Sequence, residues 1–187
     1  LEAAGTISGT VFGPAGADLE IVSIDATGVD GNQFSTSVDS PDGSYTLGGL
    51  ATGTYDLTFS DGSGALLAGT LSGAPVQAGE PTQAQNSSLV AAGTISGTVF
   101  GPAGADLSDL RVEAYDVDGN WVSDTQVDPD NGTYSLRGFA TGTYRLEFTD
   151  NNDELIPGTL SGVVVTAGET TGGSDITLSA SGRSPGR

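Results

Sequence analysis

A segment of 17 residues occurs twice in this chain without a change, and it constrains the fold more than any other feature. The segment AAGTISGTVFGPAGADL runs from Ala3 to Leu19 and again from Ala91 to Leu107, a shift of 88 residues. Later segments recur in the same order, since LATGTYDLTF at 50–59 corresponds to FATGTYRLEF at 139–148. The repeating units of solenoid proteins have only about 20–50 residues. The chain therefore contains a duplicated domain.

The duplication predicts domains at residues 3–90 and 91–180, followed by a tail or linker at residues 181–187. Domains of about this size fold alone but bury only a modest core. Ala91, Ala92 and Gly93 separate the last expected strand of the first repeat from the first strand of the second. So short a connection allows little independent motion. We therefore expect an extended and fairly stiff pair.

Apolar and polar residues alternate in short runs, which is the pattern of β-strands. In GTYDLTF at 53–59 every second residue from the Tyr onward is apolar, and GTYRLEF at 142–148 repeats the pattern. Turn pairs such as Asp42-Gly43 and Asn131-Gly132 separate the runs and favour tight hairpins. No window has helical periodicity, and the 30 Gly residues argue against helices. About seven short strands per repeat predict an all-β protein of two antiparallel sandwiches.

The composition restricts the partners. The chain has 24 acidic residues, 5 Arg and no His, which gives a net charge of −19, and the first repeat has no basic side chain. This charge disfavours nucleic acid and anionic membranes, whereas it favours cations and tolerance of salt. No apolar run reaches the roughly 20 residues that a spanning helix needs. We expect no nucleic-acid partner and no membrane insertion.

The composition also argues against an enzyme. The chain contains no Cys, His or Lys, so the usual activated nucleophiles and Schiff-base chemistry are absent. Paired carboxylates could hydrolyse glycosides, but each acidic cluster coincides with a turn. The Gly-rich segment GTISG is not a phosphate loop, because it leads into no helix and no GK[ST] motif. The sequence predicts a protein without catalytic activity.

The order of the motifs resembles that of the carboxypeptidase regulatory-like, or transthyretin-like, domains and of the B-type repeats of Gram-positive surface adhesins. The resemblance covers nearly all of residues 5–178. In the second repeat it rests on ISGTVFG at 95–101, VEAYDVD at 112–118, DPDNGTYSL at 128–136, GTYRLEF at 142–148 and the closing pair of runs at 163–178. It implies tandem immunoglobulin-like or transthyretin-like sandwiches.

The resemblance also implies a function, a non-catalytic stalk or spacer in an extracellular surface or secreted protein. Its partners would be neighbouring domains of the larger protein or identical subunits in self-assembly. Many adhesin repeats carry an internal Lys–Asn isopeptide bond, which is impossible here because the chain has no Lys. The alternative function is a carbohydrate- or cell-wall-binding accessory module of a secreted hydrolase. An exposed aromatic row on one sheet would favour that alternative.

The acidic turns of the second repeat are candidates for a calcium site, which would stabilise the domain. Calcium takes about 6–8 oxygen ligands. Asp116, Asp118 and Asn120 place oxygen atoms at alternate positions, and Asp128 and Asp130 lie on the adjoining hairpin. The other interpretation is that Asp and Asn are simply turn-forming residues. The sequence leaves both interpretations open.

The first repeat has a thinner set of possible calcium ligands. They are Asp30, Asn32, Asp39 and Asp42. Gly28 stands where Asp116 stands in the second repeat, so we expect weaker binding there.

Trp121, the only Trp in the chain, follows the acidic turn at 116–120. An isolated aromatic side chain is either a platform on which a sugar ring stacks or a partly buried residue at the rim of the core. The sequence leaves this choice open as well.

Overall fold

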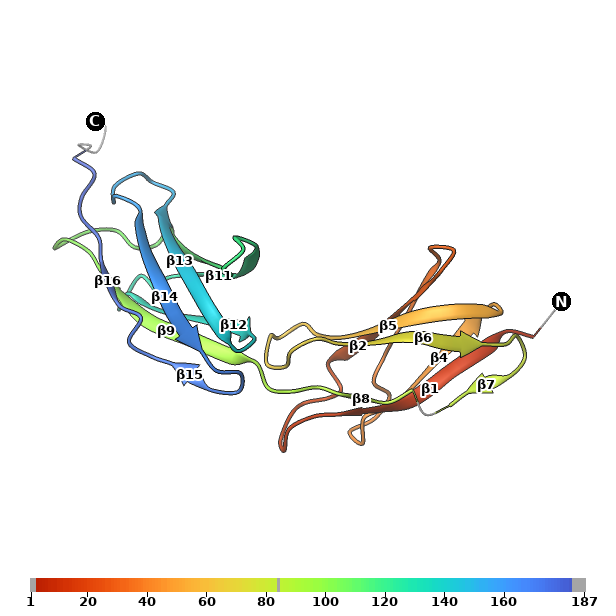
Figure 1. Cartoon of the computed structure of the whole chain (residues 1–187). Coiled ribbons are helices and arrows are strands. Elements are labelled where there is room, and N and C mark those ends of the chain that lie inside the picture. Colours follow the sequence, from red (N-terminus) through yellow and green to blue (C-terminus); the bar gives the residue numbers. More distant parts are fainter. Residues whose placement is uncertain (1–2, 84, 183–187) are drawn as a thin grey trace. The chain divides into compact units, whose positions relative to one another are not determined.

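The computed structural model describes residues 3–83 and 85–182. The chain divides between Ala91 and Ala92 into two compact units, which we call unit 1 and unit 2 (Figure 1). Among the described residues every regular element is a β-strand, eight in each unit, so the predicted all-β fold is confirmed. No helix of this part of the chain has the length and apolar character needed to span a bilayer. From residue 183 onward the expected tail lies outside the described residues.

The two units have the same order of strands. Unit 1 contains β1 (Gly5–Phe12), β2 (Val22–Gly28), β3 (Gln33–Ser37), β4 (Ser44–Leu50), β5 (Gly53–Asp61), β6 (Gly69–Val76), β7 (Pro81–Thr82) and β8 (Ser87–Ser88). Unit 2 contains β9 (Gly93–Phe100), β10 (Leu110–Tyr115), β11 (Trp121–Gln126), β12 (Thr133–Phe139), β13 (Gly142–Asp150), β14 (Gly158–Val165), β15 (Thr170–Thr171) and β16 (Ile176–Thr177).

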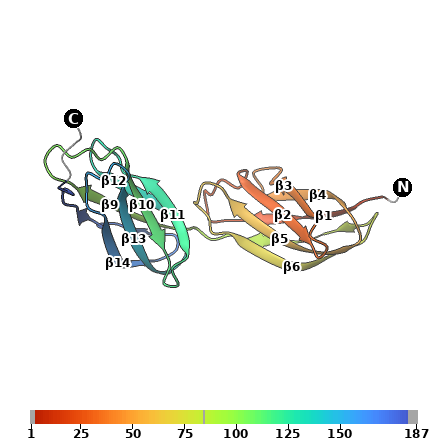
Figure 2. The ribbon, with the colours of Figure 1, turned by 90° about the horizontal axis from the view of Figure 1, so that it is seen from above.

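Each unit is a sandwich of two sheets. In unit 1 one sheet has the order β3-β2-β5-β6, and its strands lie side by side in Figure 2. The other sheet joins β4, β7 and β8 to β1. Unit 2 repeats this arrangement with β11-β10-β13-β14 in one sheet and β12, β15 and β16 around β9 in the other.

The core of each unit lies between its two sheets. In unit 1 the ring of Tyr45 on β4 meets the ring of Phe59 on β5 edge to face, with centroids 5.7 Å apart. In unit 2 Tyr134 and Phe148 form the equivalent pair at 5.5 Å. All four side chains are buried. Burial of one such side chain stabilises a fold by roughly 1.5–3 kcal/mol, so these pairs hold the sheets together.

A second Tyr in each unit fixes the connection between the sheets. The Tyr55 hydroxyl donates a hydrogen bond to the carbonyl of Ala51 at 3.2 Å, four residues upstream, and Tyr144 does the same to Ala140 at 2.9 Å. Immunoglobulin-like sandwiches have such a tyrosine corner. The predicted immunoglobulin-like fold is therefore confirmed in detail.

The closing strands differ from a fully antiparallel sandwich. β7 and β8 pair with β1 in the parallel direction, and β15 and β16 pair with β9 in the same way. Parallel neighbours need a crossover connection. Here the chain crosses from β6 or β14 in one sheet to β7 or β15 in the other. The first and last strands of each unit therefore run in the same direction.

Candidate functional site

The predicted calcium turn of unit 2 is the hairpin between β10 and β11. One carboxylate oxygen of Asp116 accepts hydrogen bonds from the backbone N–H groups of Asp118 at 2.9 Å and Asn120 at 2.8 Å. The other accepts from the side-chain amide of Asn120 at 2.9 Å. The hydrogen bonds from Asn120 lower the pKa of the Asp116 carboxyl group. Asp116 therefore closes its own turn.

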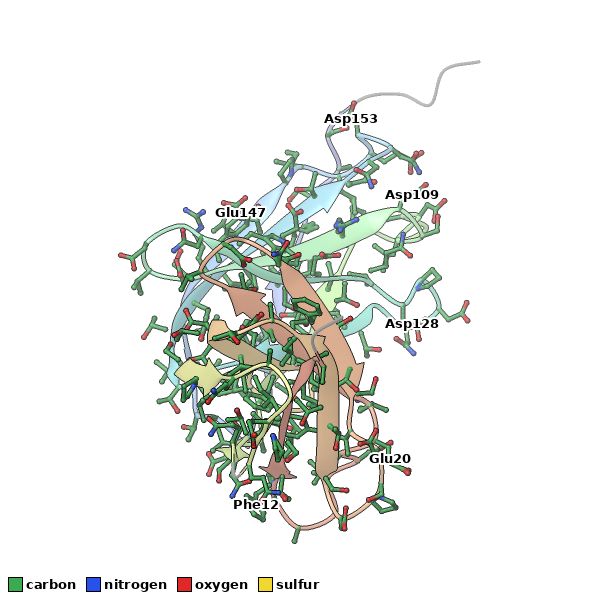
Figure 3. The ribbon with its side chains drawn as sticks, turned by 90° about the vertical axis from the view of Figure 1, so that its right-hand side faces the viewer. Phe12, Glu20, Asp109, Asp128, Glu147 and Asp153 are labelled. Atoms are coloured by element: carbon green, nitrogen blue, oxygen red, sulfur yellow. The ribbon has the colours of Figure 1, made fainter. Side chains whose placement is uncertain are left out.

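The other predicted ligands lie in the next hairpin, between β11 and β12. Asp128 accepts hydrogen bonds from the backbone N–H of Asp130 and from the side-chain amide of Asn131, both at 2.9 Å. Figure 3 shows Asp109, Asp128 and Asp153 in three separate loops. Within residues 3–83 and 85–182, no group of three acidic side chains is close enough together to hold a metal ion. Turn formation accounts for the observed contacts, and calcium binding stays a prediction.

The acidic turns of unit 1 use different residues for the same purpose. Asp30 accepts hydrogen bonds from the backbone N–H of Asn32 at 3.1 Å and from its side-chain amide. Asp30 thus closes the turn of unit 1 as Asp116 closes the turn of unit 2. Gly28, which stands at the position of Asp116, has no side chain that could do so. In the next hairpin the N–H of Asp39 donates to the carbonyl of Ser44 at 2.7 Å.

Asp42 stabilises that second hairpin of unit 1 through its side chain. Its carboxylate accepts hydrogen bonds from the Ser40 hydroxyl and from the Ser44 N–H, the latter at 3.0 Å. These contacts, led by that of Ser40, lower the pKa of the Asp42 carboxyl group. The four predicted residues of unit 1 thus lie in two turns rather than around one centre.

Two further aspartates, neither of them a predicted calcium ligand, organise the loops that follow β5 and β13. Asp150 is only 4% exposed, and its carboxylate accepts hydrogen bonds from the N–H groups of Asn152, Glu154 and Leu155 at 2.9–3.0 Å. A carboxylate at the end of a strand, followed by a polar turn, is the only sequence signal of this role.

Asp61 holds the corresponding loop of unit 1. It accepts hydrogen bonds from the N–H groups of Ser63 at 2.7 Å and of Ala65 and Leu66 at 2.9 Å. Burial raises the pKa of the Asp61 carboxyl group, but the hydrogen bonds together outweigh burial, and the pKa is lowered. Charged acceptors of this kind make stronger hydrogen bonds than neutral ones.

The first strand and the closing segment of each unit form a continuous row of hydrogen bonds, which we call the terminal seam. In unit 2 it comprises Thr94 N–H to Glu169 O at 2.9 Å, Ser174 N–H to Ser96 O at 3.2 Å, Thr98 N–H to the Asp175 carboxylate at 2.7 Å and Leu178 N–H to Phe100 O at 2.8 Å. In unit 1 the same contacts join Thr6 to Glu80, Gln85 to Ser8, Thr10 to the Asn86 side chain and Leu89 to Phe12 at 2.8–3.3 Å.

The middle of the seam needs a Gly and a Tyr. A Cβ atom on Gly97 would lie 2.2 Å from the carbonyl oxygen of Ser174, so only Gly lets the closing segment approach β9. The hydroxyl of Tyr134 donates a hydrogen bond to that same carbonyl. The N–H group of Thr98 donates its hydrogen bond to the side chain of the next residue, Asp175, instead of to a backbone carbonyl.

Unit 1 builds the middle of its seam from Gly9, Tyr45 and Gln85. A Cβ atom on Gly9 would lie 2.2 Å from the Gln85 carbonyl oxygen, and Tyr45 donates a hydrogen bond to this oxygen at 2.5 Å. Burial raises the pKa of the Tyr45 hydroxyl to about 12. Burial also raises the pKa of Tyr134 in unit 2.

Unit 2 carries a row of large side chains on the outer face of one sheet, with Trp121 and Arg145 exposed and Tyr115 half-buried, which we call the outer row. Trp121 on β11 lies opposite Tyr115 on β10, and Tyr115 lies opposite Arg145 on β13. Trp121 is 57% exposed, whereas its neighbour Val122 packs against the core, so the indole points outward. The Arg145 guanidinium lies 5.2 Å from the centroid of the Tyr115 ring.

Charged residues surround the outer row. Arg145 forms an ion pair with Glu147 at 3.0 Å, and Figure 3 shows Glu147 on its strand. Arg111 forms ion pairs with Asp124 and, at 3.7 Å, with Glu113. The Tyr115 hydroxyl donates a hydrogen bond to Glu113 at 3.2 Å.

Unit 1 has a different surface at the same place. Gln33, Thr27 and Asp56 lie opposite one another on β3, β2 and β5, where unit 2 has its outer row. A shallow hollow on this face is lined by Asp25, Thr27, Gln33, Phe34, Ser35 and Thr58. The sequence singled out Trp121, but its neighbours in the row depend on strand register.

Three solved structures are similar to this chain at low identity. The match to the Bacillus anthracis TIE protein has 14% identity and a TM-score of 0.37, and covers 95% of this chain and 34% of that one. The minor pilin GBS52 of Streptococcus agalactiae gives 11% identity and a TM-score of 0.45, with coverage of 97% and 99%. The match to a streptococcal ancillary pilin has 10% identity and a TM-score of 0.48, and it covers 96% of this chain and 63% of that one. This chain thus spans about a third of the TIE protein chain.

Sequence comparison assigns unit 2 more directly. No curated protein sequence matches the chain. The family model of the carboxypeptidase regulatory-like domain matches residues 94–179, which include nearly all of β9 and every later strand. Unit 2 is therefore similar to the carboxypeptidase regulatory-like domains, as its motifs predict, and unit 1 repeats its strand order within the same chain.

Proposed function

We propose that this chain is a non-catalytic spacer that carries tension along a surface or secreted protein. The observation that carries the proposal is the parallel direction of the first and last strands of each unit. In unit 2 the chain enters β9 at Gly93 and leaves at Thr177, which lies opposite Phe100 at the other end of β9. A strand of this length spans about 25 Å. Units built in this way can follow one another along a chain.

The terminal seam suits such a unit to bear load. Tension on the two ends of unit 2 runs along β9 and the closing segment 169–178. The seam hydrogen bonds join these two segments side by side, so the load is shared and several bonds must break together. A hairpin pulled at its two adjacent ends would instead lose its bonds one after another. The seam therefore resists extension better than its small number of bonds indicates.

The composition makes this resistance depend on hydrogen bonds. The chain has no Cys and no Lys, so neither a disulfide nor a Lys–Asn isopeptide bond can tie the strands together. Tyr134 and Asp175 contribute side-chain bonds to the seam of unit 2, and Tyr45 and Asn86 do so in unit 1. These four residues are the ones on which mechanical strength should depend most.

The partners of a spacer are the domains before and after it, or identical subunits when the protein assembles. We place the protein at the cell surface or in the extracellular space. The net charge of −19 supports a well-solvated module, because a net charge far from zero favours solubility.

Single-molecule force spectroscopy on the whole chain tests the proposal. We expect two force peaks, one for each unit. Asp175→Ala removes one seam bond and should lower one peak, while the other stays unchanged. Val112→Ala, which truncates a buried core residue on β10 outside the seam, is the control. It should reduce equilibrium stability with a smaller loss of unfolding force. If Asp175→Ala and Val112→Ala lower the unfolding force equally for an equal loss of stability, the seam does not bear the load.

A further inference from the structure

We propose that the outer row of unit 2 is a binding site for an uncharged glycan, with Trp121 and Tyr115 as the groups on which sugar rings stack. This goes beyond the spacer function and does not depend on it. The two aromatic residues are direct cross-strand neighbours, and Arg145 continues the row on the third strand. Adjacent strands lie about 4.8 Å apart, so the row extends over roughly 10 Å of a sheet face.

The fold does not require this row. Unit 1 builds the same sheet in the same order with Gln33, Thr27 and Asp56 at the matching positions. The identical segments of the two repeats include the first strand, whereas these outward positions differ completely. Trp121 leaves more than half of its surface in water, and Val117 in the adjacent turn is 79% exposed. Neither side chain belongs to the hydrophobic core, so both are available to a ligand.

Two members of the row, Tyr115 and Arg145, are held by contacts of their own. The guanidinium of Arg145 lies over the Tyr115 ring, and Glu113 accepts the hydrogen bond of the Tyr115 hydroxyl. Arg145 is in turn held by its ion pair with Glu147. A side chain fixed in its binding orientation loses little entropy when a ligand arrives.

The surroundings of the row favour a ligand with many hydroxyl groups. Aromatic rings such as those of Trp and Tyr present an apolar face, which fits the C–H face of a sugar ring. A sugar hydroxyl group can both donate and accept hydrogen bonds. The Glu113 carboxylate can accept from it, and the Arg145 guanidinium can donate to it. Sites for small ligands combine an apolar platform with a few polar groups in this way.

The charges argue against other ligands. The net charge of −19 disfavours an acidic glycan and a nucleic acid as ligands of the outer row. The buried centre of a protein–protein interface is depleted of charged residues. Here Arg111, Glu113, Asp124 and Glu147 lie around two aromatic rings. An uncharged glycan is therefore the ligand that fits best.

The fluorescence of Trp121 provides a direct test, because no other Trp is present. We would titrate the whole chain with soluble cello-, xylo-, manno- and chito-oligosaccharides, and measure retention on the matching insoluble polysaccharides. At least one of these glycans should change the Trp121 emission saturably. Tyr115→Thr, which installs the residue that unit 1 carries, should weaken that binding at least tenfold.

Two variants complete the test. The triple substitution of Trp121→Gln, Tyr115→Thr and Arg145→Asp copies the unit 1 surface and should abolish retention, with an unchanged circular dichroism spectrum. Asp175→Ala, in the seam, should leave glycan binding unchanged. The glycan proposal and the spacer proposal can therefore be refuted independently of each other. Retention by the triple variant, no binding to any glycan of the panel, or binding of an oligolysine peptide in place of the glycans would overturn the proposal.

Discussion

In unit 2 the hydroxyl of Tyr134 donates a hydrogen bond to the backbone carbonyl of Ser174, 40 residues further along the chain. The ring of the same Tyr packs against Phe148 in the core. Tyr134 therefore joins the hydrophobic core to the terminal seam at the point where Gly97 brings the two segments closest. Unit 1 repeats this arrangement with Tyr45 and the carbonyl of Gln85.

Tyr134→Phe should destabilise unit 2 by about 1–3 kcal/mol, because the change removes the hydroxyl donor and leaves the Ser174 carbonyl without it. Urea unfolding followed by Trp121 fluorescence measures this directly, since the only Trp lies in unit 2. Tyr115→Phe, on the outer face, is the matched control and should not shift the midpoint. If both variants shift it equally, the hydroxyl of Tyr134 has no special role in the seam.

At high pH the same tyrosines should destabilise the protein. The pKa of Tyr45 is raised from 10.0 to about 12 in the folded state, so the unfolded chain loses the proton first. The corresponding stability is fully present below pH 10.0 and is lost as the pH rises toward about 12. Tyr134 acts in the same direction.

Thermal melting followed by circular dichroism over this alkaline range measures the effect. The double variant Tyr45→Phe and Tyr134→Phe should start with a lower melting temperature and then lose less of it as the pH rises. An equal decline in wild type and double variant would show that the raised pKa values do not control alkaline unfolding.

The sandwich could be predicted because apolar and polar residues alternate regularly along its longer strands. Tyr55, Leu57 and Phe59 on β5 are all buried, as the period of two indicates. The last strand of unit 1 was expected just before Ala91, where β8 lies, but the parallel direction of the closing strands could not be predicted, because strands of two residues show no alternation. Their direction follows from tertiary packing against the first strand instead.

The outer row could not be predicted from the sequence for a related reason. The pairing of β10 with β11 is irregular between Ala114 and Tyr115, so that Ala114 faces Ser123 whereas Tyr115 faces Trp121. A shift of one residue moves a side chain to the opposite face of a sheet. The sequence therefore identified Trp121, but not the residues beside it.

Gly97→Ala should destabilise unit 2 by about 1–3 kcal/mol or more, because its Cβ atom would meet the Ser174 carbonyl at 2.2 Å, and the backbone on both sides would have to move. Gly172→Ala is the control in the same unit, since its Cβ atom would meet only the Ser96 hydroxyl at 3.8 Å. The urea midpoint from Trp121 fluorescence distinguishes them. A Gly97 variant as stable as the Gly172 variant would refute the close approach of the seam.

Monovalent salt should raise the melting temperature, because mobile ions screen the repulsion among 24 acidic groups that face only five Arg residues. The effect should be larger in unit 1, which has no basic side chain. Circular dichroism melting between low and molar NaCl, compared with the Trp121 signal of unit 2, separates the two units. A melting temperature that falls with salt would mean that the carboxylates are already paired.

Calcium binding at the turn of Asp116, Asp118 and Asn120 is the last prediction, with Asp128 or Asp130 as additional ligands. A cation that binds only the folded state stabilises it by mass action. We expect excess CaCl2 to raise the melting temperature of unit 2 above its value in EDTA at matched ionic strength. Trp121, which follows Asn120 directly, should report the same event by a change in emission.

Asp118→Ala provides a clean comparison, because the hydrogen bond from residue 118 to Asp116 uses the backbone N–H, which Ala keeps. The variant should retain the turn and lose the response to calcium. Unit 1 should respond less, since Gly28 stands in place of Asp116. If calcium shifts the wild type no more than the Asp118 variant, the Asp116 carboxylate serves only to close its hairpin, as its hydrogen bonds with Asn120 already do.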